Sequence, residues 1–387
     1  MAIPLKYNIG NIVSRKLSTA MTILGIGVVI AVMISMLALY NGVRTAIVSS
    51  GSAENLIVLR EGALTEGTSV VTRDAYRIIR SLPGIERDSS GNPLVSPESV
   101  IIFKLPKKDD PVGSNVNVRG VTPLAFAVRP ALKLVEGRMF RPGVNEVIVS
   151  TRVRSRFANV GIGDSFQFGP RRWSVVGIFD GKGTSFDSEI WADVDYLGLA
   201  QKRTNYSSVV VRPTDAASFQ SVSDAIRNDN RLKLNTKSEY KYYADQTQGL
   251  VGIVILVSFV TIFMVIGATL GAMNTMFSAV ASRTRELATL RALGFKRRSI
   301  LLSVMIEAAI ISFLGGLMGI LLALPVNGIS TGTTNFQTFS EVAFNFRISP
   351  AVAGFSLALA TLAGILGGLL PAVTASRLPI TRALREI

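Results

Sequence analysis

The stretch of sequence that decides the fold is SRTRELATLRALGFKRRSILLSVMIE, which spans residues 282–307 between two long hydrophobic segments. Leucines recur every third residue from Leu287 to Leu293 while charged residues take the other faces, and this pattern predicts a short amphipathic helix. Gly294 is a typical C-terminal stop for such a helix. The basic run of residues 296–298 follows directly, and basic residues beside a span favour the cytoplasmic side. We therefore expect a short helix at the cytoplasmic membrane surface.

Four hydrophobic segments are long enough to cross a membrane, because each offers about 20 mostly apolar residues. We place them at residues 20–42, 250–275, 300–325 and 351–373. Their short flanks carry twelve basic residues, which are Lys6, Arg15, Lys16, Arg283, Arg285, Arg291, Lys296, Arg297, Arg298, Arg377, Arg382 and Arg385. Only Glu286 and Glu386 oppose them, so we expect both termini and the loop 276–299 in the cytoplasm.

This topology places residues 43–249 outside the cytoplasm as a large domain. The stretch 41–249 contains 28 Lys and Arg residues against 22 Asp and Glu residues, which is a mild excess. The formal net charge of +15 therefore comes largely from the cytoplasmic flanks of the spans. Charge placed in this way reflects membrane topology, so we predict no nucleic-acid partner.

The composition excludes most kinds of enzyme chemistry. The 387 residues include no Cys and no His, which excludes disulfides, thiol nucleophiles, imidazole bases and the usual zinc ligand sets. No Gly-x-x-x-x-Gly-Lys-Ser/Thr sequence occurs, and the run Gly181-Lys182-Gly183-Thr184 lacks the upstream glycine of a phosphate-binding loop. We therefore predict no catalytic, cofactor-binding or metal-binding residues, and a chain that is not an enzyme.

The pattern of predicted strands and helices in the outer domain changes twice along the sequence. A strand at 55–60, a helix from Arg73 capped by Thr72 and a strand at 100–105 form a β-α-β unit. Short strands separated by turns follow, and then a strand at 208–212 and a helix that starts near Thr214 or Asp215 return to the first pattern. We expect an α+β lobe of residues 43–110 and 206–249 that is split by a mostly β lobe of residues 111–205.

Three shorter regions complete the predicted organisation. Residues 1–19 are either a helix lying in the inner membrane interface or an extension of the first span, and the sequence leaves both open. In the outer loop 326–350, residues from Val342 to Ile348 alternate as in a strand, which could pack beneath the large domain. Residues 374–387 form a cytoplasmic tail.

Small residues recur one helical turn apart in three of the four spans. The pairs are Gly267-x-x-x-Gly271, Gly315-x-x-x-Gly319 and Gly364-x-x-x-Gly368. Such pairs let helix backbones approach closely, although glycine is also common in membrane helices generally. The three pairs together favour close packing, but the sequence does not separate contacts within one chain from contacts between chains.

Glu307 is an ionisable residue inside the third span, about two turns from its cytoplasmic end. A charged group at that depth costs a few kcal/mol unless it is paired or hydrated. Two interpretations follow, either a role in substrate binding or coupling, or a hydrogen bond that fixes the packing of the cytoplasmic segment. The second is the one we favour.

These motifs resemble those of a known family. The family has an Arg-x-x-Glu-Ile-Gly…Arg-Ala-Leu-Gly element. A similar stretch here is Arg283-Thr284-Arg285-Glu286-Leu287 through Leu290-Arg291-Ala292-Leu293-Gly294, followed by Ile300, Glu307 and Gly315-Gly316. Ala288 stands where many members have Gly. A second similarity is Leu370-Pro371-Ala372…Ala375…Pro379…Ala383-Leu384-Arg385. A weaker one combines Leu134-x-x-Gly137-Arg138, residues 145–149 and Val160-Gly161-x-Gly163-Asp164. The chain resembles permease subunits of MacB-type ABC transporters with FtsX-like membrane domains, which include lipoprotein-extraction permeases and DevC-like glycolipid exporter permeases.

The resemblance implies a fold and a mechanism. It implies four transmembrane helices and a two-lobed extracytoplasmic domain, and it makes the cytoplasmic helix the coupling helix that docks on an ATPase. The coupling residues on this basis are Arg283, Arg285, Glu286, Leu287, Leu290, Arg291 and Gly294. Some members carry the ATPase on the same chain. The resemblance here implies a separate ABC ATPase subunit that binds ATP and Mg.

The function expected from this resemblance is export by mechanotransmission, in which ATP hydrolysis by the partner moves the outer domains. The cargo would be a lipid, lipoprotein, peptide or drug, and the location the bacterial inner membrane. Four helices form no platform for a two-fold ATPase, so a second copy or a paralogue of the permease is expected, with a periplasmic adaptor as a further possible partner. The alternative is an FtsX-like regulator that transmits ATPase motion to an extracytoplasmic enzyme.

Overall fold

The computed structural model describes residues 16–335 and 337–377, together with Pro4, Tyr7, Gly10 and Ser14. Most of residues 1–19 and all of residues 378–387, where the surface helix and the end of the tail were expected, lie outside the described residues. The chain divides into two compact units. The first consists of Met1–Asn41, Gly252–Ile329 and Phe346–Ile387, and the second of Gly42–Val251 and Ser330–Asn345.

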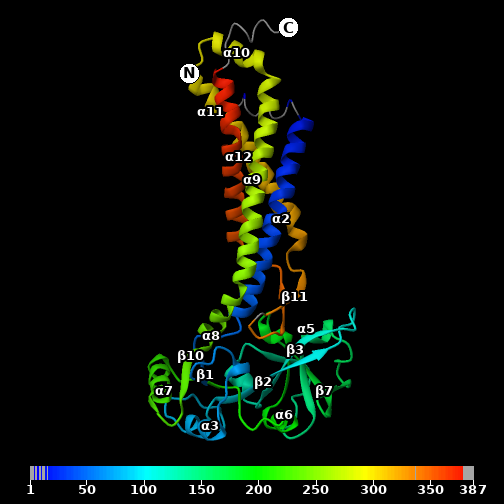
Figure 1. Cartoon of the computed structure of the whole chain (residues 1–387), viewed down its shortest axis with the longest axis vertical. Coiled ribbons are helices and arrows are strands. Elements are labelled where there is room, and N and C mark those ends of the chain that lie inside the picture. Colours follow the sequence, from blue (N-terminus) through cyan, green and yellow to red (C-terminus); the bar gives the residue numbers. More distant parts are fainter. Residues whose placement is uncertain are drawn as a thin grey trace. The chain divides into compact units, whose positions relative to one another are not determined.

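The first unit is built from long apolar helices that run alongside one another (Figure 1). Its helices are α2 (Lys16–Val48, which continues into the second unit), α9 (Val251–Ala281), α10 (Thr284–Ala292), α11 (Arg297–Ala323) and α12 (Pro350–Arg377). Four of them are long and apolar enough to cross a membrane. At 1.5 Å per residue the 33 residues of α2 extend about 50 Å, well beyond a hydrocarbon core of about 30 Å. The helices are therefore longer than the hydrophobic segments that the sequence marks.

The second unit contains a split α+β lobe. Its elements are β1 (Leu56–Arg60), α3 (Arg73–Arg80), β2 (Val95–Leu105), β9 (Ser208–Val211), α7 (Ala216–Asn228), β10 (Leu234–Ser238) and α8 (Glu239–Gln246). The strands lie in the order β10-β1-β9-β2, all neighbours antiparallel. The predicted cap of α3 is confirmed, because the Thr72 side chain accepts a hydrogen bond from the Ala75 amide. This β-α-β plus β-α-β arrangement is a ferredoxin-like unit with a long insertion between β2 and β9.

The insertion is the mostly β lobe. It contains β3 (Ser114–Val121), α4 (Ala125–Val128), β4 (Lys133–Gly137), β5 (Glu146–Ser150), α5 (Thr151–Arg156), β6 (Ser165–Phe168), β7 (Arg171–Asp180), β8 (Glu189–Asp193) and α6 (Val194–Ala200). Strand β2 pairs with β9 through its first half and with β3 through its second, so a single ten-stranded sheet carries both lobes. Two separate cores remain, one around Trp173 and one around Val209. The predicted two-lobed fold class is confirmed.

A short hairpin between α11 and α12 belongs to the second unit. Its strands are β11 (Ser330–Thr334) and β12 (Glu341–Asn345). The alternation around Val342 predicted β12, whereas the run Ser-Thr-Gly-Thr-Thr of β11 has no apolar alternation to reveal it. Of the outer loop 326–350, whose strand pattern left packing beneath the large domain open, residues Ser330–Asn345 are thus part of that unit.

Candidate functional site

Helix α10 is anchored to the membrane bundle through one apolar face. Leu287 and Ala288 are buried, and Leu290 is half-buried. Leu287 and Leu290 pack in a cluster that includes Val280 of α9 and Ile300 of α11. Helix α10 lies at one end of the bundle, between the end of α9 and the start of α11 (Figure 1). The amphipathic pattern in the sequence therefore sets which face of α10 turns inward.

An ion pair fixes the start of α10 to α11. Arg283 Nη2 lies 2.6 Å from Glu307 Oε1 and 2.7 Å from Oε2, and both side chains are at least nine-tenths buried. A buried charge near a membrane is stable only when it is paired, and this partner comes from the helix that the pair must hold. The pair fits the packing interpretation of Glu307.

Two further contacts tie the end of α10 in place. Arg291 Nη1 donates a hydrogen bond of 2.9 Å to the Ser376 carbonyl oxygen of α12. Gly294 has a φ of +95°, which an L side chain rarely adopts, and the Phe295 amide donates to the Leu290 carbonyl oxygen across this turn. Gly294 therefore serves the turn that ends α10.

The opposite face of α10 is exposed and charged. Arg285, Glu286 and Leu293 are exposed, and Leu293 keeps 69% of its surface accessible. The Tyr7 hydroxyl donates a hydrogen bond of 3.4 Å to Glu286 Oε2. Of the seven predicted coupling residues, Arg283 and Leu287 thus turn fully inward, Leu290 and Arg291 partly so, and Gly294 shapes the turn. Only Arg285 and Glu286 present their side chains for an external partner.

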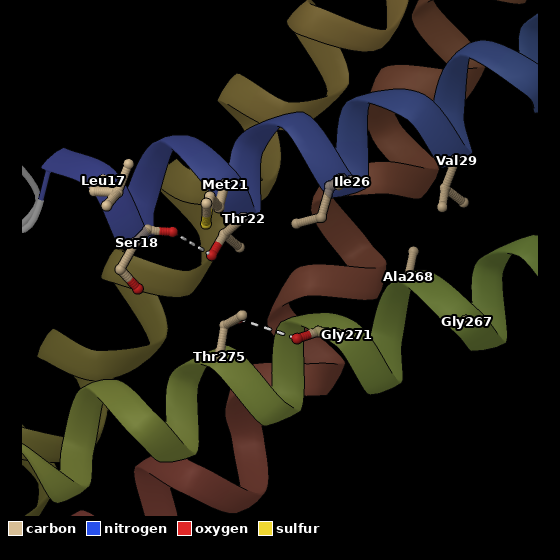
Figure 2. A pocket seen from close by; sticks show the side chains of 11 residues that line it. Leu17, Ser18, Met21, Thr22, Ile26, Val29, Gly267, Ala268, Gly271 and Thr275 are labelled. Atoms are coloured by element: carbon tan, nitrogen blue, oxygen red, sulfur yellow. Dashed lines mark hydrogen bonds between the residues drawn. The ribbon is translucent and has the colours of Figure 1, made fainter.

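A groove of about 580 Å³ lies between α2 and α9, along residues 17–29 of α2 and 267–275 of α9 (Figure 2). Its walls are mostly apolar, and the hydroxyls of Thr22 and Thr275 donate to backbone oxygens of their own helices. The glycines of the groove, Gly25, Gly267 and Gly271, have open space where a side chain would stand. The groove therefore offers an apolar surface of low relief.

The other two glycine pairs are used inside the bundle. Side chains at Gly315 or Gly319 would collide with Ile26 and Ile30 of α2, and those at Gly364 and Gly368 with α11. These pairs therefore hold the helices of one chain together. Of the three motifs, only Gly267-x-x-x-Gly271 has no neighbouring helix among the described residues packed against its glycines. Two of the motifs thus serve contacts within the chain, and the third lies on a free helix face.

The outer domain buries a charge network that sequence patterns did not reveal. Arg119 on β3 contacts Glu66, Glu98 and Glu189 at 2.7–2.8 Å, and all four side chains are almost inaccessible to water. Burial alone would lower the pKa of Arg119, but Glu189 and Glu66 outweigh that effect and raise this pKa well above its ordinary value. These partners come from both lobes, so Arg119 links the α+β lobe to the mostly β lobe.

Arg129 extends the network. Its Nη1 lies 2.6 Å from Glu98 Oε1, and its Nη2 lies 2.8 Å from Glu239 Oε1 at the start of α8. Burial would raise the pKa of Glu98, but Arg129 and Arg119 hold that pKa below its ordinary value. Neither arginine belongs to a short motif, so only the fold brings these charges together.

Family models match both halves of the chain. The model described as a MacB-like periplasmic core domain matches residues 19–229, and the model described as an FtsX-like permease C-terminal region matches residues 258–380. The first match alone spans more than half of the sequence. The chain belongs to the MacB/FtsX-like family of ABC-transporter permeases. With its four spans it is a multi-pass protein of the bacterial inner membrane.

Curated relatives of the family match 96% of this chain. The macrolide export ATP-binding/permease protein MacB of Bdellovibrio bacteriovorus is 29% identical over 96% of this chain and 60% of its own length. The pyoverdine export ATP-binding/permease protein PvdT of Pseudomonas fluorescens is 28% identical over 96% of this chain and 58% of its own length. The chain thus spans somewhat over half the length of these MacB/FtsX-like relatives.

Two solved outer domains of related transporters are similar to part of the chain. The extracellular domain of the noncanonic ABC-type transporter YknZ from Gram-positive bacteria covers 47% of this chain and 99% of that structure, with 17% identity and a TM-score of 0.38. The periplasmic region of MacB from Actinobacillus actinomycetemcomitans covers 53% and 95%, with 14% identity and a TM-score of 0.39.

Proposed function

We propose that this MacB/FtsX-like permease transmits force from an ABC ATPase, which lies outside these 387 residues, to its outer domain. The observation that carries the proposal is the geometry of α10. Its inner face is bound to α9, α11 and α12 by Leu287, by the Arg283–Glu307 pair and by the Arg291 hydrogen bond. Its outer face leaves Arg285 and Glu286 accessible. A partner that pushes on α10 would therefore move three helices together.

The proposed topology puts α10 and both termini in the cytoplasm, where ATP is available. Three basic residues at 296–298 lie at the start of α11, just after the turn that ends α10, and are all exposed. Basic residues so close to a span resist translocation. The second unit then lies on the periplasmic side, where cargo would be moved without passing between the spans.

The permease is proposed to act as a pair, because an ABC ATPase works as a two-fold assembly and needs a docking site on each side. The open motif Gly267-x-x-x-Gly271 in the groove between α2 and α9 supports this proposal. Small residues let a second backbone approach closely within a membrane, where the hydrophobic effect does not draw helices together. The second copy is either this chain or a paralogue.

The proposed cargo is a lipid, lipoprotein, peptide or drug, and a periplasmic adaptor is a proposed further partner. Export is favoured over regulation of an outer enzyme because the MacB-like core-domain model, and not only the FtsX-like model, matches the sequence. ATP hydrolysis is proposed to reside entirely in the partner, which supplies the ATP and Mg sites.

The experiment is reconstitution of the permease with its ATPase in lipid nanodiscs. The double variant Arg285→Ala/Glu286→Ala should lose stimulation or coupling of ATP hydrolysis while the permease itself stays folded, because both side chains point away from the bundle. The variant Lys202→Ala/Arg203→Ala, exposed on the outer domain, is the matched control. Coupling that is unchanged in the α10 variant would contradict the proposal.

A further inference from the structure

The β11–β12 hairpin is encoded between two membrane helices but packs within the outer unit. The chain leaves the first unit after Ile329, forms the hairpin, and returns at Phe346. Val342, Ala343 and Phe344 of β12 are all buried. The strand therefore has a packed environment within the outer unit, although the chain on each side of it belongs to the membrane unit.

One carboxylate holds the hairpin to the mostly β lobe. Glu341 is 6% exposed, and its Oε2 lies 2.7 Å from Lys107 Nζ, while its Oε1 is paired with Arg156. Burial would raise the pKa of Glu341, but its ion pairs with Lys107 and Arg156 lower this pKa overall. The Ala343 amide also donates a 2.6 Å hydrogen bond to Ser188 Oγ. The hairpin is thus held by ion pairs of Glu341 and by a hydrogen bond from its own backbone.

The same hairpin contacts the two chain segments through which the outer unit joins the spans. Gly42 of α2 lies so close to β12 that a Cβ atom there would collide with the Asn345 carbonyl oxygen. Asn335 Nδ2 donates a 3.3 Å hydrogen bond to Gln246 Oε1 at the end of α8. Gly249, three residues later, has Gln337 where its Cβ would point.

We propose that the β11–β12 hairpin is a clamp that locks the C-terminal ends of α2 and α8 onto the mostly β lobe, with Glu341 as its locking residue. Movement of α11 and α12 then reaches the outer domain through the hairpin, in parallel with α2 and α9. This transmission step rests on the proposed function. The locking step does not, because every contact that forms it lies within the outer unit.

The locking step is tested by cysteine accessibility in the full-length chain. The natural sequence has no Cys, so Ala343→Cys, at a position 2% exposed, provides a single buried thiol. Replacing Glu341 with Gln leaves Lys107 and Arg156 without their anion, and maleimide should then modify the thiol about tenfold faster or more. Glu136→Gln removes an exposed ion pair with Arg154 in the same lobe and should leave the rate unchanged. Equal rates in the two backgrounds would overturn the clamp.

The transmission step is tested in the complex with the ATPase. Dyes on Leu64→Cys, 80% exposed, report the distance between the outer domains of two copies as nucleotide is added. Glu341→Gln should reduce the nucleotide-dependent change by at least about half while hydrolysis continues. A short thiol cross-link between Ser188→Cys and Ala343→Cys should restore it.

The outcomes of this second experiment separate the two claims. A full distance change in Glu341→Gln would overturn transmission through the hairpin and leave the proposed function intact. No distance change in the complex with the native Glu341 would instead contradict the proposed function and the transmission step together, while the accessibility experiment would still decide whether the hairpin is locked.

Discussion

The outer domain and the membrane bundle bury charge in opposite ways. The outer domain gathers Arg119, Arg129 and four carboxylates into one network between its lobes. The bundle, within the described residues, buries the single pair Arg283–Glu307 where α10 meets α11. The network joins several segments at once, whereas the pair holds one short helix in place.

The difference follows from the solvent in which each region folds. In water, apolar burial builds the two cores of the outer domain, and the charges between them specify how the lobes meet. In a membrane, the hydrophobic effect contributes little to contact between helices. Small residues such as Gly315 and Gly364 instead let the helices pack closely. A charge is tolerated there only with its partner. The comparison predicts that losing one charge has the larger effect on stability in the outer domain.

Replacing Arg119 with Met should have the largest effect. The variant leaves Glu66 and Glu189 buried without their cation, which costs about 3–5 kcal/mol of unfolding free energy. Thermal unfolding, followed through the buried Trp173 and Trp191, measures the loss. Arg73→Met breaks a half-exposed pair with Asp195 and should cost about 1 kcal/mol or less. Similar losses in the two variants would contradict the importance of the network.

Replacing Arg283 with Ala should loosen α10 without unfolding the bundle. Glu307 then lacks its partner, and the local free energy of opening should fall by about 2 kcal/mol, which corresponds to about 30-fold faster amide exchange in residues 284–292. Hydrogen exchange with mass spectrometry measures this change. Arg285→Ala, on the exposed face, is the control and should leave exchange unaltered. Unchanged exchange in Arg283→Ala would show that the ion pair does not hold α10.

Glycines in the bundle should divide into two kinds. Gly364→Leu forces a side chain onto Ser312 and should destabilise the bundle by about 1–3 kcal/mol. Gly271→Leu meets open space within the chain, so it should leave unfolding of the single chain unchanged and weaken association of two copies. Chemical unfolding and cross-linking in nanodiscs separate the two effects. Gly252→Leu, open in the same helix but outside the motif, is the control for association.

Acid should weaken the outer domain slightly through its paired carboxylates. Arg138 lowers the pKa of Glu146 from its ordinary 4.5 to about 2, so the stabilisation from this pair is complete above pH 4.5 and is lost as the pH falls towards 2. Because Arg138 is half-exposed and solvent screens the pair, the loss from Glu146 between pH 7 and pH 4 should be small, about 0.5 kcal/mol or less. Melting temperatures of the native chain and of Glu146→Gln at both pH values measure it. A smaller acid shift in Glu146→Gln is expected, and an equal shift would contradict the assignment.

Local patterns in the sequence were sufficient to predict much of the fold. The leucine repeat located α10, Gly294 marked the turn that ends it, and Thr72 marked the start of α3. The polar edge strands β4 and β11 went unpredicted, because strands with few apolar residues lack the alternation that marks a strand. Elements whose own residues carry the signal were therefore predicted, and elements formed by pairing were not.

The candidate site shows the same limit. Sequence patterns singled out Arg283 and Glu307 but did not pair them, since they lie 24 positions apart and are separated by α10, a turn and the start of α11. Arg119 and its carboxylates lie on β2, β3, β8 and the short 3-10 helix after β1, so only the assembled sheet brings them together. Glu341 likewise acquires its role from Lys107 and Arg156, far away in the chain.

Photo-cross-linking from the exposed face of α10 is the measurement that tests the central claim most directly. A photoreactive residue at Thr289, which is exposed on that helix, should form an adduct with the ABC ATPase in the assembled complex. The same residue at Leu64 of the outer domain should form none. An ATPase adduct at Thr289 alone is the predicted result. An adduct at Leu64, or none at Thr289 in a complex that hydrolyses ATP, would contradict the account.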